Sequence, residues 1–196
     1  MPYSKEHKKA TRQKILDSAI RLFSSKGFDQ VSIDSLMLDA GLTRGAFYSH
    51  FGSKQEVYAK AIIAGAKKSR ISEQKPVEMS QEEWAKNLLL GYLSEDHVNQ
   101  NISPCPLAFL VTDIANNEVE VKETYTRMFK LLNKTIQSQL KDSTGLVCIE
   151  EKDVLATTAM MIGGVAISRA LNDDVFTKKF LESCRQEALV LLKLDK

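Results

Sequence analysis

The chain has 196 residues, of which 43% are hydrophobic and 27% charged, so its composition excludes a disordered chain and predicts a buried core. Its net charge of +2 hides an asymmetry, because residues 1–70 contain 13 Lys and Arg against 6 Asp and Glu, whereas the remainder is acidic. A basic N-terminal end on an acidic body indicates that this end meets a polyanion.

Helical periodicity dominates, and the 9 Gly and 4 Pro are too few for the frequent turns of a β-sandwich or barrel. Three short helices come first in the chain. We expect one that ends at Gly27, one over about 33–40 that Ser32 caps and Gly41 closes, and one from Thr43 to about Phe51.

The later helices are longer. A fourth is expected over 53–70, followed by a linker at 71–79 that contains Pro76. Further helices are predicted at about 80–92, from Pro104 onward, and over 117–141, 150–171 and 173–194, which gives an all-α chain of about nine helices. The apolar stretch 154–171 is interrupted by polar residues and is too short for a membrane span, so we expect a buried helix and no membrane partner.

The segment from the second to the third helix has the layout of a helix-turn-helix, in which the second helix of the pair enters the major groove of DNA. Residues 43–54 supply the side chains that this role needs. Arg44 is a long donor suited to a guanine edge, and Gly45 is small enough for close approach. Tyr48, His50 and Lys54 can reach phosphates, whereas Phe47 and Phe51 share one face and should be core.

These residues make the chain resemble a known family. The segments Gly27-Phe28, Val31-Ser32-Ile33 and 40–54 (Ala-Gly-Leu-Thr-Arg-Gly-Ala-Phe-Tyr-Ser-His-Phe-Gly-Ser-Lys) are similar to the DNA-binding domain of TetR family transcriptional repressors. The resemblance covers roughly residues 10–65, with Leu36-Met37 where the family usually has Ile-Ala. It implies a homodimer whose two heads each read half of a palindromic double-stranded DNA operator, a C-terminal domain that responds to a ligand or signal, and no catalysis.

Carried over by position, Arg44 and Gly45 match family positions that approach bases. Thr43, Tyr48, His50 and Lys54 match positions on or near phosphates, and Ser32 matches the start of a helix that often touches the DNA backbone. Alternative interpretations stay open: Thr43 as a helix cap only, His50 as a packing or capping residue, and Lys5, Lys8, Lys9 and Arg12 as a solvated basic tail.

We divide the chain into a helix-turn-helix domain at 1–52, a connecting helix and linker at 53–75, and an effector-sensing and dimerisation domain at 76–196. The last two helices are the most apolar, and small residues such as Gly163 and Gly164 allow another backbone to come close. A second protomer can cover them, and the resemblance agrees, since the family dimerises through its last two helices. The alternative is an intramolecular core helix.

Aromatic and Met residues of the middle helices are candidates for a pocket that senses a hydrophobic effector, although the same residues suit ordinary packing. The main candidates are Trp84, Tyr92, Phe109, Tyr125 and Phe129. Cys105 lies at a predicted helix start, which should lower the pKa of its thiol and favour a reactive thiolate. It is therefore a candidate thiol sensor, with a small apolar cap residue as the alternative. Cys148 and Cys184 fall in an expected loop and on the last helix.

The leading hypothesis is a cytoplasmic dimeric repressor that a small hydrophobic or thiol-reactive molecule releases from its operator. The chain has three cysteines, so we expect no disulfide framework. Its N-terminus has no apolar run, so we expect no signal peptide. No metal site, cofactor or catalytic residue is expected. The alternatives are a helical protein-interaction adaptor and a thiol-reactive enzyme, neither of which binds DNA.

Overall fold

The computed structural model describes residues 4–68, 76, 78–140 and 149–194. Within these ranges all the regular secondary structure is helical. The eleven helices are α1 (Lys5–Lys26), α2 (Ile33–Asp39), α3 (Arg44–Phe47), α4 (Lys54–Lys68), α5 (Gln81–Tyr92), α6 (Glu95–Val98), α7 (Pro106–Phe109), α8 (Val111–Ala115), α9 (Val119–Gln139), α10 (Glu151–Ser168) and α11 (Asp174–Leu191).

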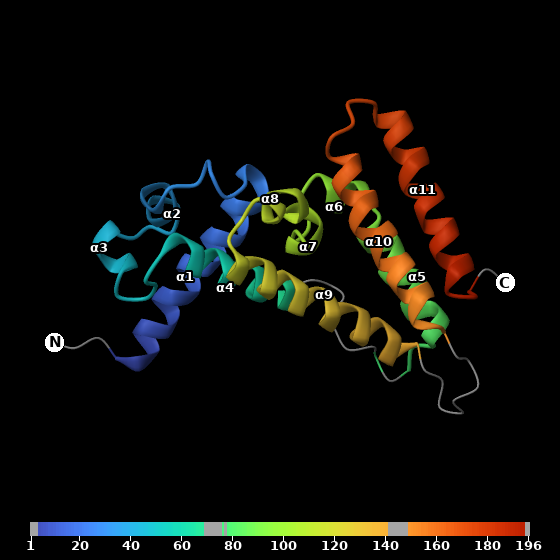
Figure 1. Cartoon of the computed structure of the whole chain (residues 1–196), viewed down its shortest axis with the longest axis horizontal. Helices are drawn as coiled ribbons and strands as arrows, with labels where there is room; N and C mark the ends of the chain where they lie inside the picture. Colours follow the sequence, from blue (N-terminus) through green and yellow to red (C-terminus); the bar gives the residue numbers. More distant parts are fainter. Residues whose placement is uncertain (1–3, 69–75, 77, 141–148, 195–196) are drawn as a thin grey trace.

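The molecule is elongated, with two unlike ends (Figure 1). Helices α1, α2 and α3 gather at the end that carries the N-terminus, and we call them the head. Helices α10 and α11 pack side by side at the other end, next to α5. Helix α4 packs on both α1 and α9, so it joins the head to the remaining helices, which we call the body.

The head is fixed internally by both apolar and polar contacts. Phe47 and Phe51 are buried, as their shared face predicts, with ring centroids 5.8 Å apart. The buried Ser18 hydroxyl on α1 donates to the Leu36 carbonyl at 2.9 Å and to the Asp39 carboxylate at 2.6 Å. These bonds tie α2 to α1, so the recognition segment is carried on a rigid base.

The predicted end of α1 and the predicted start and end of α2 are confirmed. Ser32 caps α2 by accepting from the Ser35 amide, and the Ser35 hydroxyl closes a reciprocal bond with the Ser32 amide, both at 3.0 Å. Gly27 ends α1 with a φ of 77°, and Gly41 follows α2 with a φ of 67°. Both angles lie in the left-handed region that favours glycine, which explains why the chain turns at these two points.

The helix number differs from the nine expected. The chain forms the extra helix α6 within a segment that has little periodicity, where the Ser94 hydroxyl caps the His97 amide at 3.2 Å. The helix expected from Pro104 breaks into α7 and α8 at Leu110, whose ψ of 4° interrupts the regular turn. The expected third helix is also shorter, because residues 48–50 form a turn.

The longer helices form where the sequence predicts them. Helix α9 buries Val121, Met128, Leu132 and Ile136 along one side, as its periodicity requires. Helices α10 and α11 make the most extensive helix–helix contact among the described residues. No described helix combines the length and the apolar character needed to pass through a bilayer.

Candidate functional site

The start of α3 presents the predicted base-reading residues to solvent. Arg44 and Gly45 occupy the first two positions of the helix and are exposed, and Tyr48, just after it, is 58% exposed although it packs edge-on against the buried Phe47 ring. The buried Phe47 side chain fixes one side of α3 against the rest of the head, so the opposite side of the helix faces solvent. This is the arrangement that a recognition helix needs, because its first residues are free to approach base edges.

The Arg44 guanidinium is paired with a carboxylate of the neighbouring helix. Its Nη1 lies 2.7 Å from the Asp34 Oδ2 in the first turn of α2. Both side chains are about 60% exposed, so the pair is worth little in stability. A guanine edge can therefore replace the carboxylate at small cost.

A cleft of about 680 Å³ lies between α1 and the turn-and-helix segment around α3. Its α1 side carries His7, Lys8 and Thr11, and its other side is lined by 41–43, Gly45, Ala46, Ser49 and His50. The basic groups of α1 therefore face the same space as the recognition segment. A cationic side chain such as Lys8 at this cleft would attract a phosphate group.

His50 lies at the edge of this cleft and is half-buried. Burial lowers the pKa of its imidazole, and the nearby Lys8, Arg12 and His7 lower it further. The ring is therefore neutral at pH 7 in the free protein. Its Nδ1 is buried and makes no hydrogen bond to any described residue.

Of the remaining residues predicted to contact DNA, two are exposed and one is held in a contact within the chain. Ser32 and Thr43 are exposed at the N-caps of α2 and α3, but the Thr43 side chain makes no capping hydrogen bond, unlike Ser32. The Lys54 ammonium lies over the Phe28 ring, 4.0 Å from its centroid. Lys54 would have to leave this cation–π contact to reach a phosphate.

In the body, three of the predicted sensing residues, Tyr92, Cys105 and Phe109, meet around one histidine. The Nδ1 atom of the buried His97 ring lies 2.7 Å from the Tyr92 carbonyl oxygen, and its Nε2 atom accepts a hydrogen bond from the Cys105 amide at 3.1 Å. The same ring packs against the Tyr92 and Phe109 rings, with centroids 4.5 and 5.4 Å away. Both nitrogens bind backbone groups, so the ring is a neutral imidazole that carries its proton on Nδ1. The sequence offered no signal for this role, because a single His in an irregular segment has no distinctive spacing.

Cys105 is buried at the N-cap of α7, and the pKa of its thiol is raised there, whereas the sequence predicted that it would be lowered. Burial raises the pKa of the thiol, and this outweighs the lowering by the Tyr92 hydroxyl and then by the Leu107 and Ala108 amides at the helix start. Desolvation of the thiolate therefore outweighs the helix end. The thiol is protonated at neutral pH in this conformation.

The Tyr92 hydroxyl adjoins Cys105, and its pKa is raised well above the ordinary value, mainly by burial and then by this thiol. Tyr125 donates to the Leu107 carbonyl at 2.8 Å, and burial raises its pKa to about 12. Trp84 is buried and Phe129 half-buried, and no described contact joins either to His97. Cys184 is partly exposed on α11, and Cys148 lies outside the described residues.

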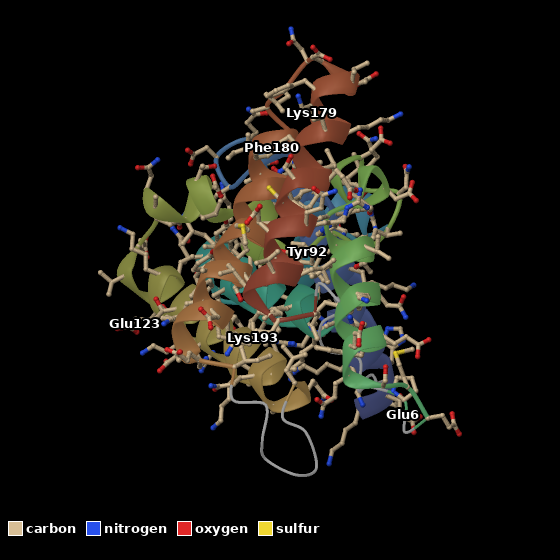
Figure 2. All side chains as sticks on the ribbon, turned by 90° about the vertical axis from the view of Figure 1, so that its right-hand side faces the viewer. Glu6, Tyr92, Glu123, Lys179, Phe180 and Lys193 are labelled. Carbon is tan, nitrogen blue, oxygen red and sulfur yellow. The ribbon has the colours of Figure 1, made fainter. Side chains whose placement is uncertain are left out.

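Helices α10 and α11 expose several large apolar side chains, and α11 also exposes Lys178, Lys179, Glu182 and Glu187. Figure 2 looks onto these two helices, which stand in front of the body. Their exposed large apolar side chains are Leu155, Ile167, Val175, Phe176 and Val190. The two glycines of α10 face opposite ways: a Cβ at Gly163 would meet nothing within 4 Å, whereas one at Gly164 would lie 2.6 Å from the Leu93 side chain.

The described residues bring together no group of three His, Cys, Asp or Glu side chains that could hold a metal ion.

Comparison with known protein families identifies the head. Residues 15–61 match the family model described as bacterial regulatory proteins, tetR family. This segment runs from the middle of α1 into α4 and includes the whole of α2 and α3.

Curated relatives resemble the same part of the chain. The transcriptional regulator AcrR of Shigella flexneri is 42% identical over 57 residues, which are 29% of this chain and 26% of the relative. The negative transcriptional regulator IcaR of the biofilm operon in Staphylococcus epidermidis is 35% identical over 51 residues, or 26% of this chain and 28% of the relative. The chain thus spans little more than a quarter of these two relatives.

The likeness in structure extends over nearly the whole chain. A TetR transcriptional regulator from Chloroflexus aurantiacus superimposes with a TM-score of 0.76 at 18% identity, covering 95% of this chain and 96% of the other. At that identity the agreement establishes a shared fold.

Proposed function

The chain belongs, through its N-terminal domain, to the TetR family of bacterial regulatory proteins, and we propose that it is a dimeric repressor that releases a palindromic DNA operator when an effector binds its body. The observation that carries this proposal is the exposed start of α3. There Arg44 and Gly45 are exposed, and Gly45 lines the cleft that also holds His7 and Lys8 of α1. Arg44 would donate to a base edge, and Ser32, Thr43, Tyr48, His50 and Lys54 would hold phosphates on either side.

The dimer would form through the outer side of α10 and α11. Five exposed apolar side chains on these helices are costly to leave in water, and a second copy of the same surface would bury them around a two-fold axis. The open space at Gly163 supports close approach of a partner helix. Such a dimer can bind a palindrome when its two α3 helices lie about 34–36 Å apart, one turn of DNA.

The effector would act at the cluster around His97. Its aromatic rings favour a small hydrophobic molecule, and Trp84, Tyr125 and Phe129 of the body stay candidates for the same pocket. The effector must bind the released spacing of the heads more tightly than the DNA-bound spacing. A thiol-reactive effector would instead form a bond to the Cys105 sulfur with loss of the thiol proton. Since that thiol is buried and protonated, the reaction would proceed from an opened form of the body.

Repression, rather than activation, is favoured by the relatives. IcaR, which shares the head, is a negative regulator. A dimer bound across a promoter can block transcription without touching polymerase, and no further surface is then required.

Selection of duplexes from a random-sequence pool, followed by binding measurements across a salt series, tests the proposal. We expect a palindromic consensus and an affinity that falls steeply between about 50 and 200 mM salt, because phosphate contacts release counterions. Failure to enrich any sequence, together with no binding at low salt, would reject DNA recognition and leave a helical adaptor as the better interpretation.

A further inference from the structure

The C-terminal end of α1 is held by side chains of the body. A helix end leaves carbonyl and amide groups without partners in the helix. Here the Ser24 carbonyl, in the last turn of α1, and the Phe28 amide, just after it, both bind body residues that follow them by more than 70 positions in the sequence. The head is therefore attached to the body at two places: through α4 and at this helix end.

Arg169 makes the longest-range of these contacts. It is the C-cap residue of α10, and its Nη2 donates to the Ser24 carbonyl at 3.1 Å. Its Nη1 donates to the Phe109 carbonyl at 3.3 Å, and the guanidinium lies over the Phe109 ring, 4.1 Å from the centroid. One planar group thus joins α10 and α7 to the end of α1.

Asp113 of α8 completes the attachment. Its Oδ2 accepts the Phe28 amide at 3.0 Å and also the Tyr58 hydroxyl of α4. A Cβ at Gly27 would approach the same carboxylate to 3.3 Å, so the glycine is needed there both for its positive φ and for space.

Gln100 supports the same carbonyl from another side. Its Nε2 lies 3.5 Å from the Ser24 oxygen, and its φ of 60° is one that residues other than glycine rarely adopt. Strained backbone of this kind persists where surrounding contacts fix it, and here it brings a second donor to the end of α1.

We propose that Arg169 is a positioning residue that fixes the angle of the head relative to α10, and so sets the operator spacing that the dimer accepts. The proposal rests on the proposed function, in which α10 lies at the two-fold axis. A contact from α10 to α1 then fixes the orientation of each recognition helix relative to that axis. Phe109 packs on His97, so the same guanidinium also touches the sensing cluster.

The test uses the palindromic duplex selected by the wild-type protein and two versions of it, with one base pair added or removed at the centre. Wild type should bind the selected spacing more tightly than either altered spacing. In Arg169→Gln this preference should fall about fivefold or more, because the heads adopt a wider range of angles. Arg169→Lys should lose it as well, since one ammonium cannot bind both carbonyls and cover the ring.

Arg127→Gln is the matched control, because Arg127 is an exposed arginine on α9 and its loss removes the same charge. Its spacing preference should equal that of wild type. A preference that survives in both Arg169 variants would overturn the positioning role, as would loss of folding in both. A wild-type protein that binds no duplex would instead reject the proposed function itself.

Hydrogen exchange on the DNA-free protein gives an independent readout. In Arg169→Lys the amides of Gly27 and Phe28 should exchange about fivefold faster than in wild type, whereas amides in the head core, such as that of Leu36, should not change. Equal exchange at the end of α1 in the two proteins would contradict the proposal.

Discussion

At the scale of single residues, the head holds its cations in weak contacts that DNA can replace. Arg44 is paired with the exposed Asp34, and Lys54 lies over the Phe28 ring. Both contacts keep a long side chain ordered, but neither is deeply buried. Ordering before binding reduces the entropy that these side chains lose in the complex.

Replacing Arg44 by Ala should relax base preference at one position in each half-site by about 1–3 kcal/mol, because a paired donor to a base edge is lost. Binding to unselected DNA should weaken much less. Competition binding against a set of singly substituted duplexes measures the effect. Arg44→Lys is the control for charge, and a base preference that is unchanged in Arg44→Ala would reject the assigned role.

Cys105 should react slowly with iodoacetamide at neutral pH, and more slowly than Cys184. Burial raises the pKa of both thiols, but Cys105 is almost wholly covered whereas Cys184 is partly exposed. Because only the thiolate reacts, the Cys105 rate should rise as the pH increases beyond the ordinary thiol range. Peptide mapping by mass spectrometry separates the two sites, and faster labelling of Cys105 at pH 7 would contradict its buried state.

At the scale of elements, the sequence predicted those helices whose ends carry a local signal. Glycines mark the ends of α1 and α2, and Ser32 and Ser80 both cap the helix that follows them. The short helix α6 was missed, because its four residues are too few to show a period even though Ser94 caps it, and the break at Leu110 that separates α7 from α8 was not predicted. The sequence could suggest Tyr92 and Cys105 as site residues but could not place His97 between them, because that placement depends on tertiary packing.

The caps of α2 and α3 give a matched pair of stability predictions. Ser32→Ala should lower the free energy of unfolding by about 1 kcal/mol, because the reciprocal bonds with Ser35 are lost. Thr43→Ala should leave it nearly unchanged, since the Thr43 side chain makes no capping bond. Denaturant unfolding of the two variants checks this, and equal losses in both would show that Thr43 caps α3 after all.

At the scale of the whole molecule, the two ends have complementary tasks. The basic head lies at one end and the exposed apolar side chains of α10 and α11 at the other (Figure 1). In the proposed repressor, dimerisation and DNA binding would therefore use separate surfaces.

In the proposed dimer, Phe176→Glu should yield a monomer and abolish tight operator binding, because the substitution would place a charge in the interface formed by α10 and α11. Phe176 is 52% exposed in the single chain, so the fold should survive. Sedimentation velocity and circular dichroism measure the two properties. Val119→Glu on α9, at a residue 71% exposed, is the control, and a Phe176→Glu protein that stays dimeric would place the interface elsewhere.

The brevity of α3 has a consequence for the number of sites that the protein can find in a chromosome. A helix of four residues offers few side chains to the groove, and each base that it distinguishes contributes about 1–3 kcal/mol. One copy could not separate its target from the roughly 10⁶ or more competing positions of a genome. In the proposed dimer, reading two half-sites at once would add the two discriminations together, so the information content of the paired site, rather than of either half, would select the regulated gene.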